Sequence, residues 1–262
     1  LISVDGKVMA VAFMANAQHL VFRKDILEKA GIKDNAVQVR FDGLDQAVAD
    51  VTPDFRKSLD VNDVLRNEVI VAYAMNGEPL PYLNGYPLRL VVPGWYASYW
   101  IKALTDIEVL NKNDGEFWMK KAYRLPAAPC GCIEPGQTPK ATVPINKMTV
   151  RSFITNLQHN TTVKGGRTMR VNGIAFDQGY GIDQVLFSSN GGKQWQQASL
   201  GHDYGDFSFR PWEAQFTPVV GKTYRLQCLA INRIGESQRW KARWNPSGYL
   251  RNVIETVSVK AV

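Results

Sequence analysis

The chain has 262 residues, of which 45% are hydrophobic and 21% charged, and its formal net charge is +7. This composition is that of a globular protein and excludes a disordered or fibrous one. No apolar run approaches the ~20 residues that span a bilayer, so we expect a soluble chain of two domains with no membrane partner. Acidic residues separate the basic ones, which argues against a nucleic-acid partner and leaves an anionic small molecule or an acidic protein.

The first part of the chain, residues 1–125, mixes helical and strand patterns. The segment FRKDILEKAG has the spacing of an amphipathic helix that stops at Gly31. Strand patterns follow in AVQVRF, EVIVAYAM and PLRLVV. These patterns predict an α+β domain.

The segment 126–148 is rich in proline, with five prolines between Pro126 and Pro144. It shows little periodicity, and proline favours an extended backbone. We therefore expect a linker here, between the first domain and the second.

Residues 149–262 carry short strand patterns with turn signals between them. The triplet Asn190-Gly191-Gly192 predicts a hairpin, because residues of this kind adopt positive φ at little cost. The series of short strands predicts an all-β, immunoglobulin-like sandwich. Its strand segments are MTVRSFIT, RTMRVNGIAF, IDQVLFSS, WQQASL, FSFRPWEAQF, TYRLQCLAIN and VIETVSVKAV.

The cysteines are Cys130, Cys132 and Cys228. Cys130 and Cys132 lack the second pair that a zinc site needs. Cys228 lies in an alternating strand pattern, which predicts a buried thiol. The sequence contains no common hydrolase, nucleotide-binding or metalloprotease motif, and no C-x-x-C-H motif for attaching haem.

Four segments together resemble the sulfite oxidase family of molybdenum enzymes, especially its bacterial sulfite dehydrogenases. They are FDGLD, VIVAYAMNGEPLPYLNGYPLRLVVPGWYASYWIKALTDIEV, FWMKKAYRLP and WNPSGYLRNVIETVSV. The resemblance runs from about Met14 to Val262. It implies an α+β molybdopterin-binding domain followed by an immunoglobulin-like dimerisation domain.

The resemblance also implies an activity, which is oxidation of sulfite to sulfate at a molybdenum-molybdopterin centre. Because the chain has no haem motif, the electrons would leave to a separate protein, for which a c-type cytochrome is the natural acceptor. The bacterial relatives imply a homodimer in the periplasm.

Six residues match positions that contact the cofactor in this family. A phosphate-bearing pterin needs a cationic, hydrogen-bonding cradle, and a guanidinium binds phosphate through two parallel hydrogen bonds. Without the family match, Arg89 and Lys102 would be interpreted as solvated side chains at strand ends. Asn84 stands where the animal enzymes have histidine. The implied cofactor residues are Asp45, Asn84, Arg89, Trp100, Ile101 and Lys102.

Tyr123 matches the active-site tyrosine of the family, and its phenol would donate a hydrogen bond to an oxo group or to sulfite. Lys120 and Lys121 beside it would raise the local positive potential. The animal enzymes have a sulfite-binding arginine where this chain has Ser247. Arg251 is the nearest guanidinium that would replace it, and the alternative is a surface charge.

The family binds molybdenum through one cysteine, and that cysteine is missing. In LISVDGKVMAVAFMANAQH the first strand is followed almost at once by the segment that lies beyond it in the family. Either the sequence lacks a segment near residues 8–14 or the chain has lost its metal. A true deletion would uncover core surface at ~25 cal/mol per Å², so we favour the first explanation and expect a spatial break between Val8 and Met14.

Two other functions stay open at this stage. The chain could be a catalytically inactive dimerising scaffold of the same fold, which metal analysis would reveal. It could also be a molybdenum enzyme for another sulfur or oxyanion substrate, such as a protein-bound sulfane or nitrate. Steady-state turnover of each substrate would separate these.

Overall fold

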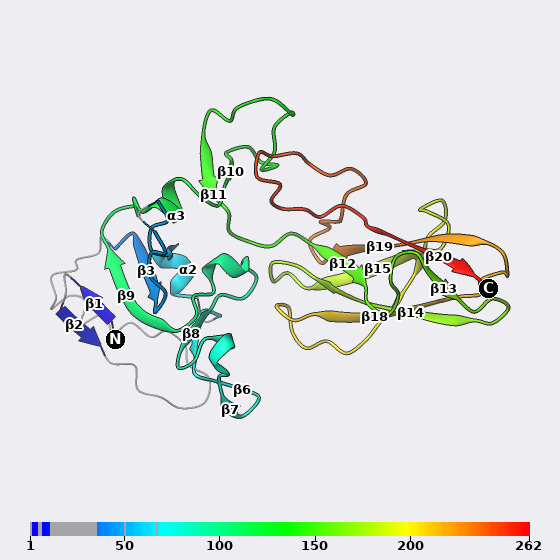
Figure 1. The fold of residues 1–262 in the computed structure, drawn as a ribbon, viewed down its shortest axis with the longest axis horizontal. Helices are drawn as coiled ribbons and strands as arrows, with labels where there is room; N and C mark the ends of the chain where they lie inside the picture. The colour runs from blue at the N-terminus through cyan, green and yellow to red at the C-terminus, as the bar shows by residue number, and fades with distance from the viewer. Residues whose placement is uncertain (1, 5–6, 11–35, 50, 67) are drawn as a thin grey trace. The chain divides into compact units, whose positions relative to one another are not determined.

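The computed structural model describes residues 2–4, 7–10, 36–49, 51–66 and 68–262. It divides into two compact units, and each combines two stretches of chain. Unit 1 comprises Leu1–Ala127 with Thr138–Asn146, and unit 2 comprises Ala128–Gln137 with Lys147–Val262 (Figure 1). The helix expected to end at Gly31 lies outside the described residues.

A mixed sheet in the order β2-β1-β9-β3-β4 forms the centre of unit 1. Strand β3 alternates buried and part-exposed residues, as the period of two predicts, and Val39 and Phe41 are completely buried. β3 pairs antiparallel with both β4 and β9, whereas β1 runs parallel to β9. The bounds are β1 Ile2–Val4, β2 Lys7–Ala10, β3 Gln38–Gly43, β4 Arg56–Asp60 and β9 Leu104–Leu110.

Short helices and two small ladders complete the described part of unit 1. Helix α2 begins after Asp60, whose side chain accepts a hydrogen bond from the Asn62 amide. The α+β class expected for the first domain is confirmed. The elements are α2 Val61–Val64, α3 Phe117–Lys120, the 3-10 helices η1 Tyr82–Asn84 and η2 Ala97–Tyr99, and the paired strands β5 Ile70–Ala72 with β8 Arg89–Val91 and β6 Ala74–Met75 with β7 Glu78–Pro79.

The proline-rich segment is more ordered than the predicted linker. Strands β10 (Arg124–Pro126) and β11 (Thr142–Pro144) pair antiparallel in unit 1. Ala128–Gln137 between them belongs to unit 2, where Ile133 donates its amide to the Trp244 carbonyl at 3.0 Å. Cys130 and Cys132 form a disulfide within this part, which the sequence did not lead us to expect. Backbone pairing at both ends therefore fixes a segment whose composition indicates an extended connector.

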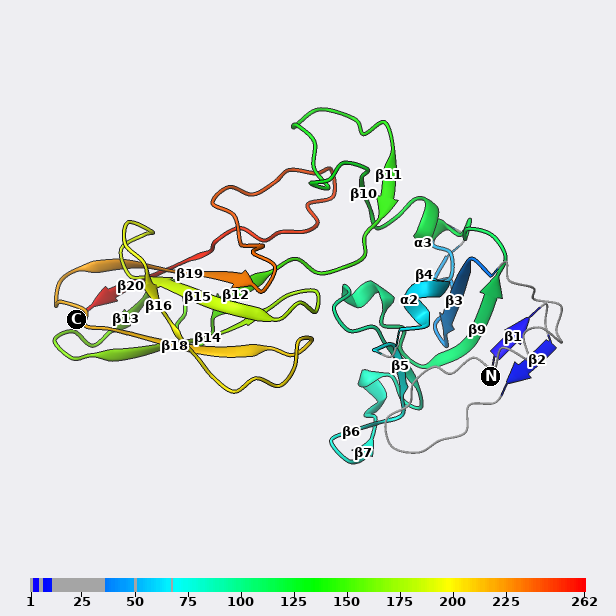
Figure 2. The same ribbon diagram turned by 180° about the vertical axis from the view of Figure 1, so that it is seen from behind.

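Unit 2 is the predicted sandwich of two β-sheets (Figure 2). The predicted hairpin at Asn190-Gly191-Gly192 is present, with φ of 73° and 83° at its glycines. Strand β13 was not predicted, because its three residues lie in a polar segment. One sheet has the order β12-β14-β18-β17, with bounds Arg151–Ile154, Met169–Phe176, Arg210–Phe216 and Ser199–Leu200. The other has the order β13-β20-β19-β15-β16, with bounds Thr161–Val163, Thr256–Ala261, Thr223–Asn232, Ile182–Ser188 and Gln196–Gln197.

The sandwich core packs tightly around one tryptophan. Trp212 is 2% exposed, and its indole nitrogen donates to Ser152 Oγ at 2.9 Å. It pairs across the sheet with Gly173, where a Cβ atom would lie 2.2 Å from the indole. Cys228 is buried in the same core, as predicted.

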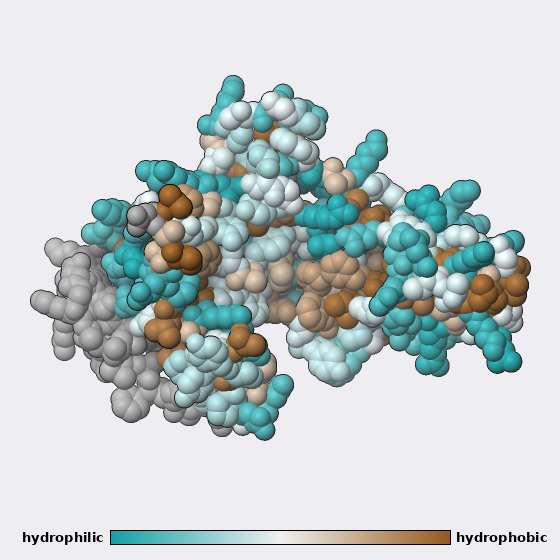
Figure 3. All heavy atoms as spheres, in the orientation of Figure 1, coloured by the Kyte–Doolittle hydropathy of each residue, from teal (hydrophilic) through white to brown (hydrophobic). Residues whose placement is uncertain are grey.

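The surface shows no single apolar face in the view of Figure 3. Hydrophilic residues cover much of each unit there, with separate hydrophobic patches among them. Among the described residues, none of the helices has the length and apolar character needed to cross a membrane.

We expect Gly173→Ala to destabilise unit 2 by about 3 kcal/mol, because the new methyl group would overlap the Trp212 ring and the Phe153 carbonyl. Urea unfolding followed by tryptophan fluorescence measures this. Gly115→Ala is the matched control, because a Cβ atom at that position would have open space within 4 Å around it, and it should change stability by less than about 0.5 kcal/mol. Equal effects of the two substitutions would contradict the packing argument.

Candidate active site

Two backbone segments of unit 1 lie side by side, and one carries Arg89 while the other carries Lys102. The Leu90 amide donates to the Ile101 carbonyl at 2.8 Å, and the Leu104 amide donates to the Leu88 carbonyl at 2.8 Å. The segment that carries Arg89 is thereby fixed against the segment that carries Lys102. The predicted proximity of the two cations is thus a consequence of main-chain pairing.

Gly85 allows this close approach. Its φ is +104°, and a Cβ atom there would lie 3.0 Å from the Lys102 Cα and 3.1 Å from the Arg89 Cβ. Both the backbone conformation and the space therefore require glycine. This residue was not among the predicted site residues, although its place in the block LNGYPLR is a turn signal.

Arg89 carries a guanidinium that is only partly satisfied. Its Nη1 donates to the Asn84 carbonyl at 3.1 Å, and its guanidinium carbon lies 5.7 Å from the centre of the Trp100 ring. Burial lowers the pKa of Arg89. Arg89 Nε and Trp100 Nε1 are buried and have no hydrogen-bond partner among the described residues. Two buried donors of this region are thus available to an acceptor that the described residues do not supply.

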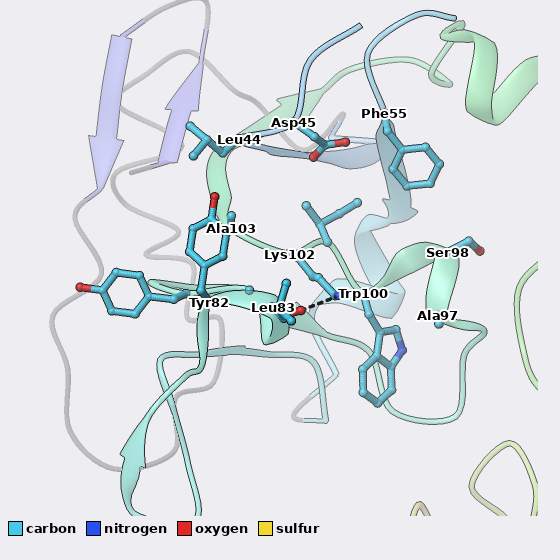
Figure 4. A pocket seen from close by; sticks show the side chains of 13 residues that line it. Leu44, Asp45, Phe55, Tyr82, Leu83, Ala97, Ser98, Trp100, Lys102 and Ala103 are labelled. Atoms are coloured by element: carbon cyan, nitrogen blue, oxygen red, sulfur yellow. Dashed lines mark hydrogen bonds between the residues drawn. The ribbon is translucent and has the colours of Figure 1, made fainter. Parts of the chain in front are cut away.

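Lys102 is held at the rim of the same region. Its Nζ donates to the Leu83 carbonyl at 2.7 Å, as the dashed line in Figure 4 shows. Neither Lys102 nor Arg89 forms an ion pair within the part of the chain that the structure describes. Their positive charge is therefore not neutralised by a carboxylate there.

A cavity of about 570 Å³ lies over these residues. Asp45 and Phe55 lie on one side of it in Figure 4, with Leu83 and Trp100 on the other. Of the predicted cofactor residues, Asp45, Trp100, Ile101 and Lys102 line it, whereas Asn84 and Arg89 are not among its lining residues. The lining residues are Leu44, Asp45, Phe55, Tyr82, Leu83, Gly85, Tyr86, Ala97, Ser98, Trp100, Ile101, Lys102 and Ala103.

Tyr123 adjoins this cavity through one aromatic ring. Its ring centre lies 6.0 Å from that of Phe55, edge to face, and Phe55 lines the cavity. Trp118 packs on both rings, at 5.1 Å from Phe55 and 5.9 Å from Tyr123. Tyr123 has a φ of +52°, which is uncommon for a residue with a bulky side chain. The predicted catalytic residue therefore lies one aromatic ring away from the cavity, in a strained turn.

Lys57 lies beneath this aromatic group and was not predicted. The residue is 1% exposed, and its Nζ donates to the Trp118 carbonyl at 2.8 Å. Burial lowers its pKa to about 8, and the nearby Arg124 contributes in the same direction, whereas Asp114 acts in the opposite direction. Burial also raises the pKa of the Tyr99 phenol next to it. The one feature of the sequence that could have identified Lys57 is that a lysine stands at an inward position of strand β4.

Arg251 belongs to unit 2, whereas the cavity is lined by residues of unit 1. Its Nε lies 3.4 Å from Glu255 Oε1, which also accepts from Arg151 at 2.8 Å. Ser247, at the position of the family's arginine, is exposed. A role for Arg251 in substrate binding stays a prediction.

The residues fit the pterin part of the implied cofactor better than its metal. The cavity, the unpartnered Arg89 and Trp100 donors and the two cations suit a phosphate-bearing, polar ring system. No group of three or more metal-binding side chains occurs within the described ranges. The residues that make up unit 1, which contains the cavity, include no cysteine. The break expected between Val8 and Met14 involves residues outside those described.

Comparison with known proteins gives two family matches. Residues 8–118 match the family described as "Oxidoreductase molybdopterin binding domain", and residues 142–261 match "Mo-co oxidoreductase dimerisation domain". The two matches fall on the two units of the structure.

Individual relatives are similar at moderate identity. Mitochondrial sulfite oxidase of Rattus norvegicus is 28% identical over 91% of this chain and 45% of its own length. Sulfite oxidase of Arabidopsis thaliana is 30% identical over 69% of this chain and 48% of its own. This chain therefore spans about half the length of the curated relatives it matches. The crystal structure of the sulfane dehydrogenase SoxCD from Paracoccus pantotrophus has the same fold, with a TM-score of 0.71 and 24% identity over 90% of this chain and 58% of that chain.

We expect Gly85→Ala to be more destabilising than Gly77→Ala by about 1–3 kcal/mol in urea unfolding. Both glycines have positive φ, so both variants carry a similar backbone strain of about 1 kcal/mol. Only at Gly85 would the new methyl group meet Lys102 and Arg89, because the space around Gly77 is open. Similar losses in both variants would show that the approach of the two segments is not tight.

The stability of unit 1 should rise with pH between about 8 and 10, because unfolded Lys57 keeps its proton up to its ordinary pKa of 10.5 whereas the folded residue loses it near 8. The slope from this residue approaches about 1.4 kcal/mol per pH unit. Above pH 10 the Tyr99 phenol acts in the opposite direction, because it ionises more easily in the unfolded chain. Urea unfolding at a series of pH values tests this, and Lys57→Met should lack the rise. An unchanged rise in that variant would contradict the assignment.

Proposed function

The chain belongs to the sulfite oxidase family of molybdenum enzymes, and we propose that it oxidises sulfite to sulfate in the periplasm and passes the electrons to a c-type cytochrome. One observation carries the proposal. A cavity is lined by Lys102, Phe55 and Trp100, whose indole nitrogen is buried without a partner among the described residues, and the Tyr123 ring packs on Phe55. This arrangement suits an anionic cofactor with an anionic substrate beside it.

Arg89 and Lys102 would hold the cofactor in this chain. The Arg89 guanidinium has a free Nε beside the Trp100 indole nitrogen, and both can donate to a phosphate or to a polar ring atom. Asp45, exposed on the opposite side of the cavity, can accept from the amino groups of a pterin. The molybdenum-molybdopterin group, when bound, supplies oxygen-atom transfer and accepts two electrons.

Tyr123 is the residue that we assign to the substrate. Its phenolic hydroxyl can donate to an oxygen of sulfite, and the positive charges of Lys57, Lys120 and Lys121 favour an anion in this region. The rings of Phe55 and Trp118 pack against the half-buried Tyr123, and a less polar surrounding of this kind strengthens such interactions.

The proposed electron acceptor and the proposed homodimer are supported by the sequence and by the family match of unit 2. The sequence has no C-x-x-C-H motif, so in this proposal the electrons pass to a haem that lies outside these 262 residues. The match of residues 142–261 to a dimerisation domain supports a homodimer through unit 2. A periplasmic location agrees with the cytochrome acceptor, which is itself part of the proposal.

An inactive dimerising scaffold is the second candidate, and the absence of a cysteine at the cavity favours it. Ser247, which stands where the family has its substrate-binding arginine, also favours the scaffold. Molybdenum analysis of the purified full-length protein separates the two functions. About one molybdenum per chain supports the enzyme, whereas a full-length protein without the metal and without the cysteine supports the scaffold.

We expect Tyr123→Phe to lower kcat/KM for sulfite by about 10²–10³, because it removes one hydrogen-bond donor from the developing anion. Sulfite-dependent reduction of cytochrome c by the molybdenum-loaded protein measures this. Tyr204→Phe is the control, since Tyr204 is 67% exposed in unit 2, and it should leave the rate unchanged. Equal rates of wild type and Tyr123→Phe would remove Tyr123 from the reaction, and no turnover of sulfite by loaded wild type would reject the function.

A further inference from the structure

Lys57 is a buried cation without a direct counter-ion. It lies on β4, faces inward and is 1% exposed. No carboxylate forms an ion pair with it within the part of the chain that the structure describes. A buried charge without an opposite charge is costly, so a folded chain keeps one only where other groups stabilise it or where a ligand supplies the missing charge.

Three groups of the site surround the Lys57 ammonium. Its Nζ donates to the Trp118 carbonyl at 2.8 Å, and it lies 4.6 Å from the centre of the Tyr99 ring and 5.5 Å from that of Tyr123. The faces of aromatic rings attract cations, and this attraction is strongest away from water. The ammonium is therefore bound to the same turn that carries the candidate catalytic tyrosine.

The charged groups around Lys57 do not cancel its charge. Arg124 on β10 adds a second positive charge, and its guanidinium donates to the Met119 and Thr142 carbonyls. Asp114 is the acidic group that favours the charged lysine, but its carboxylate accepts from Ser58 Oγ and from the Glu116 amide. Arg40 lies 3.8 Å from the same carboxylate and 3.3 Å from Glu116. Arg40 also pairs with Glu108, so among the described residues these carboxylates form their ion pairs with Arg40 and none with Lys57 or Arg124.

Lys57 and Arg124 also fix the two ends of the strained turn. Lys57 holds the carbonyl of Trp118 at its start, and Arg124 follows Tyr123 directly at its end. Tyr123 between them has φ of +52°, a conformation that persists only when its surroundings enforce it. Removal of the Lys57 ammonium would free the first of these two anchors.

We propose that Lys57 is a positioning residue, which holds Tyr123 against Phe55 at the cavity and supplies buried positive charge that favours an oxyanion substrate at the Tyr123 hydroxyl. This inference rests on the proposed function and adds a determinant of anion affinity to it. Lysine in place of arginine makes the charge titratable, because burial lowers its pKa to about 8. Substrate affinity should therefore weaken as pH rises through that value.

Steady-state kinetics of the molybdenum-loaded protein tests the inference with two variants. Lys57→Met keeps the length and apolar character of the side chain but removes the charge. We expect KM for sulfite to rise on the order of tenfold below pH 8, with a smaller change in kcat, and the pH dependence of KM near 8 to disappear. Lys57→Arg keeps its charge above pH 8, so its low KM should extend to higher pH.

A purely structural role predicts a different outcome. In that case Lys57→Met would lower kcat and stability but keep the wild-type pH dependence of KM, and this result would overturn the inference. Lys193→Met is the control, because Lys193 is exposed in the hairpin of unit 2 and its loss should leave KM and its pH profile unchanged.

A measurement without turnover keeps the inference separate from the proposed function. NMR of the lysine side chains in the full-length protein, assigned with Lys57→Met, follows the proton of Lys57 directly. Sulfate, an unreactive oxyanion, should raise the pH at which Lys57 titrates, whereas chloride at equal ionic strength should not. No difference between the two salts would overturn the inference. A clear sulfate response without sulfite turnover would instead reject the proposed function and leave the anion site standing.

Discussion

The site depends on the close approach of two backbone segments at Gly85. Main-chain hydrogen bonds pair the segment that contains Arg89 with the one that contains Lys102, and the missing Cβ of Gly85 leaves room for both. Two positive side chains are thereby held at one turn with no carboxylate pairing to either within the described residues. The chain maintains this unfavourable proximity through main-chain pairing and core packing, so the arrangement is set before any anion binds.

The aromatic group of Phe55, Trp118 and Tyr123 also holds a positive charge in place before any anion binds. Phe55, Trp118 and Tyr123 pack on one another, and the Lys57 ammonium lies against the Tyr123 and Tyr99 rings. Apolar rings remove water from around a charge, which is costly for folding but strengthens the attraction of that charge for an anion. Burial of the Lys57 ammonium therefore lowers the stability of the fold and places a positive potential beside the candidate catalytic hydroxyl.

Much of the fold could be predicted, because strand period and turn chemistry are local signals. β14, β15 and β19 each coincide with an alternating segment, and the glycines after Asn190 form the expected hairpin. Where pairing depends on distant residues, the prediction was wrong or incomplete. Strand β13 is short and polar and forms by pairing with β20, and the ends of the proline-rich segment form strands that pair with each other. Arg89 and Lys102 were predicted because they lie in a sequence segment that resembles the family. Lys57 was not predicted, because a lysine in a strand normally faces water.

The absence of a cysteine from unit 1 favours an inactive scaffold, whereas the positive charges of Arg89, Lys102 and Lys57 favour an enzyme with an anionic cofactor. Keeping these charges destabilises the folded chain, whereas lacking the cysteine does not. Without a metal, a scaffold would have no use for the cations, yet it would keep Arg89 partly unsatisfied and Lys57 buried, with no carboxylate paired to it among the described residues. Substitution of such residues by apolar ones of similar volume is often neutral or stabilising. An oxyanion or phosphate bound at the cavity would instead offset both costs at once. The cationic residues at the cavity therefore favour a chain that binds an anionic cofactor.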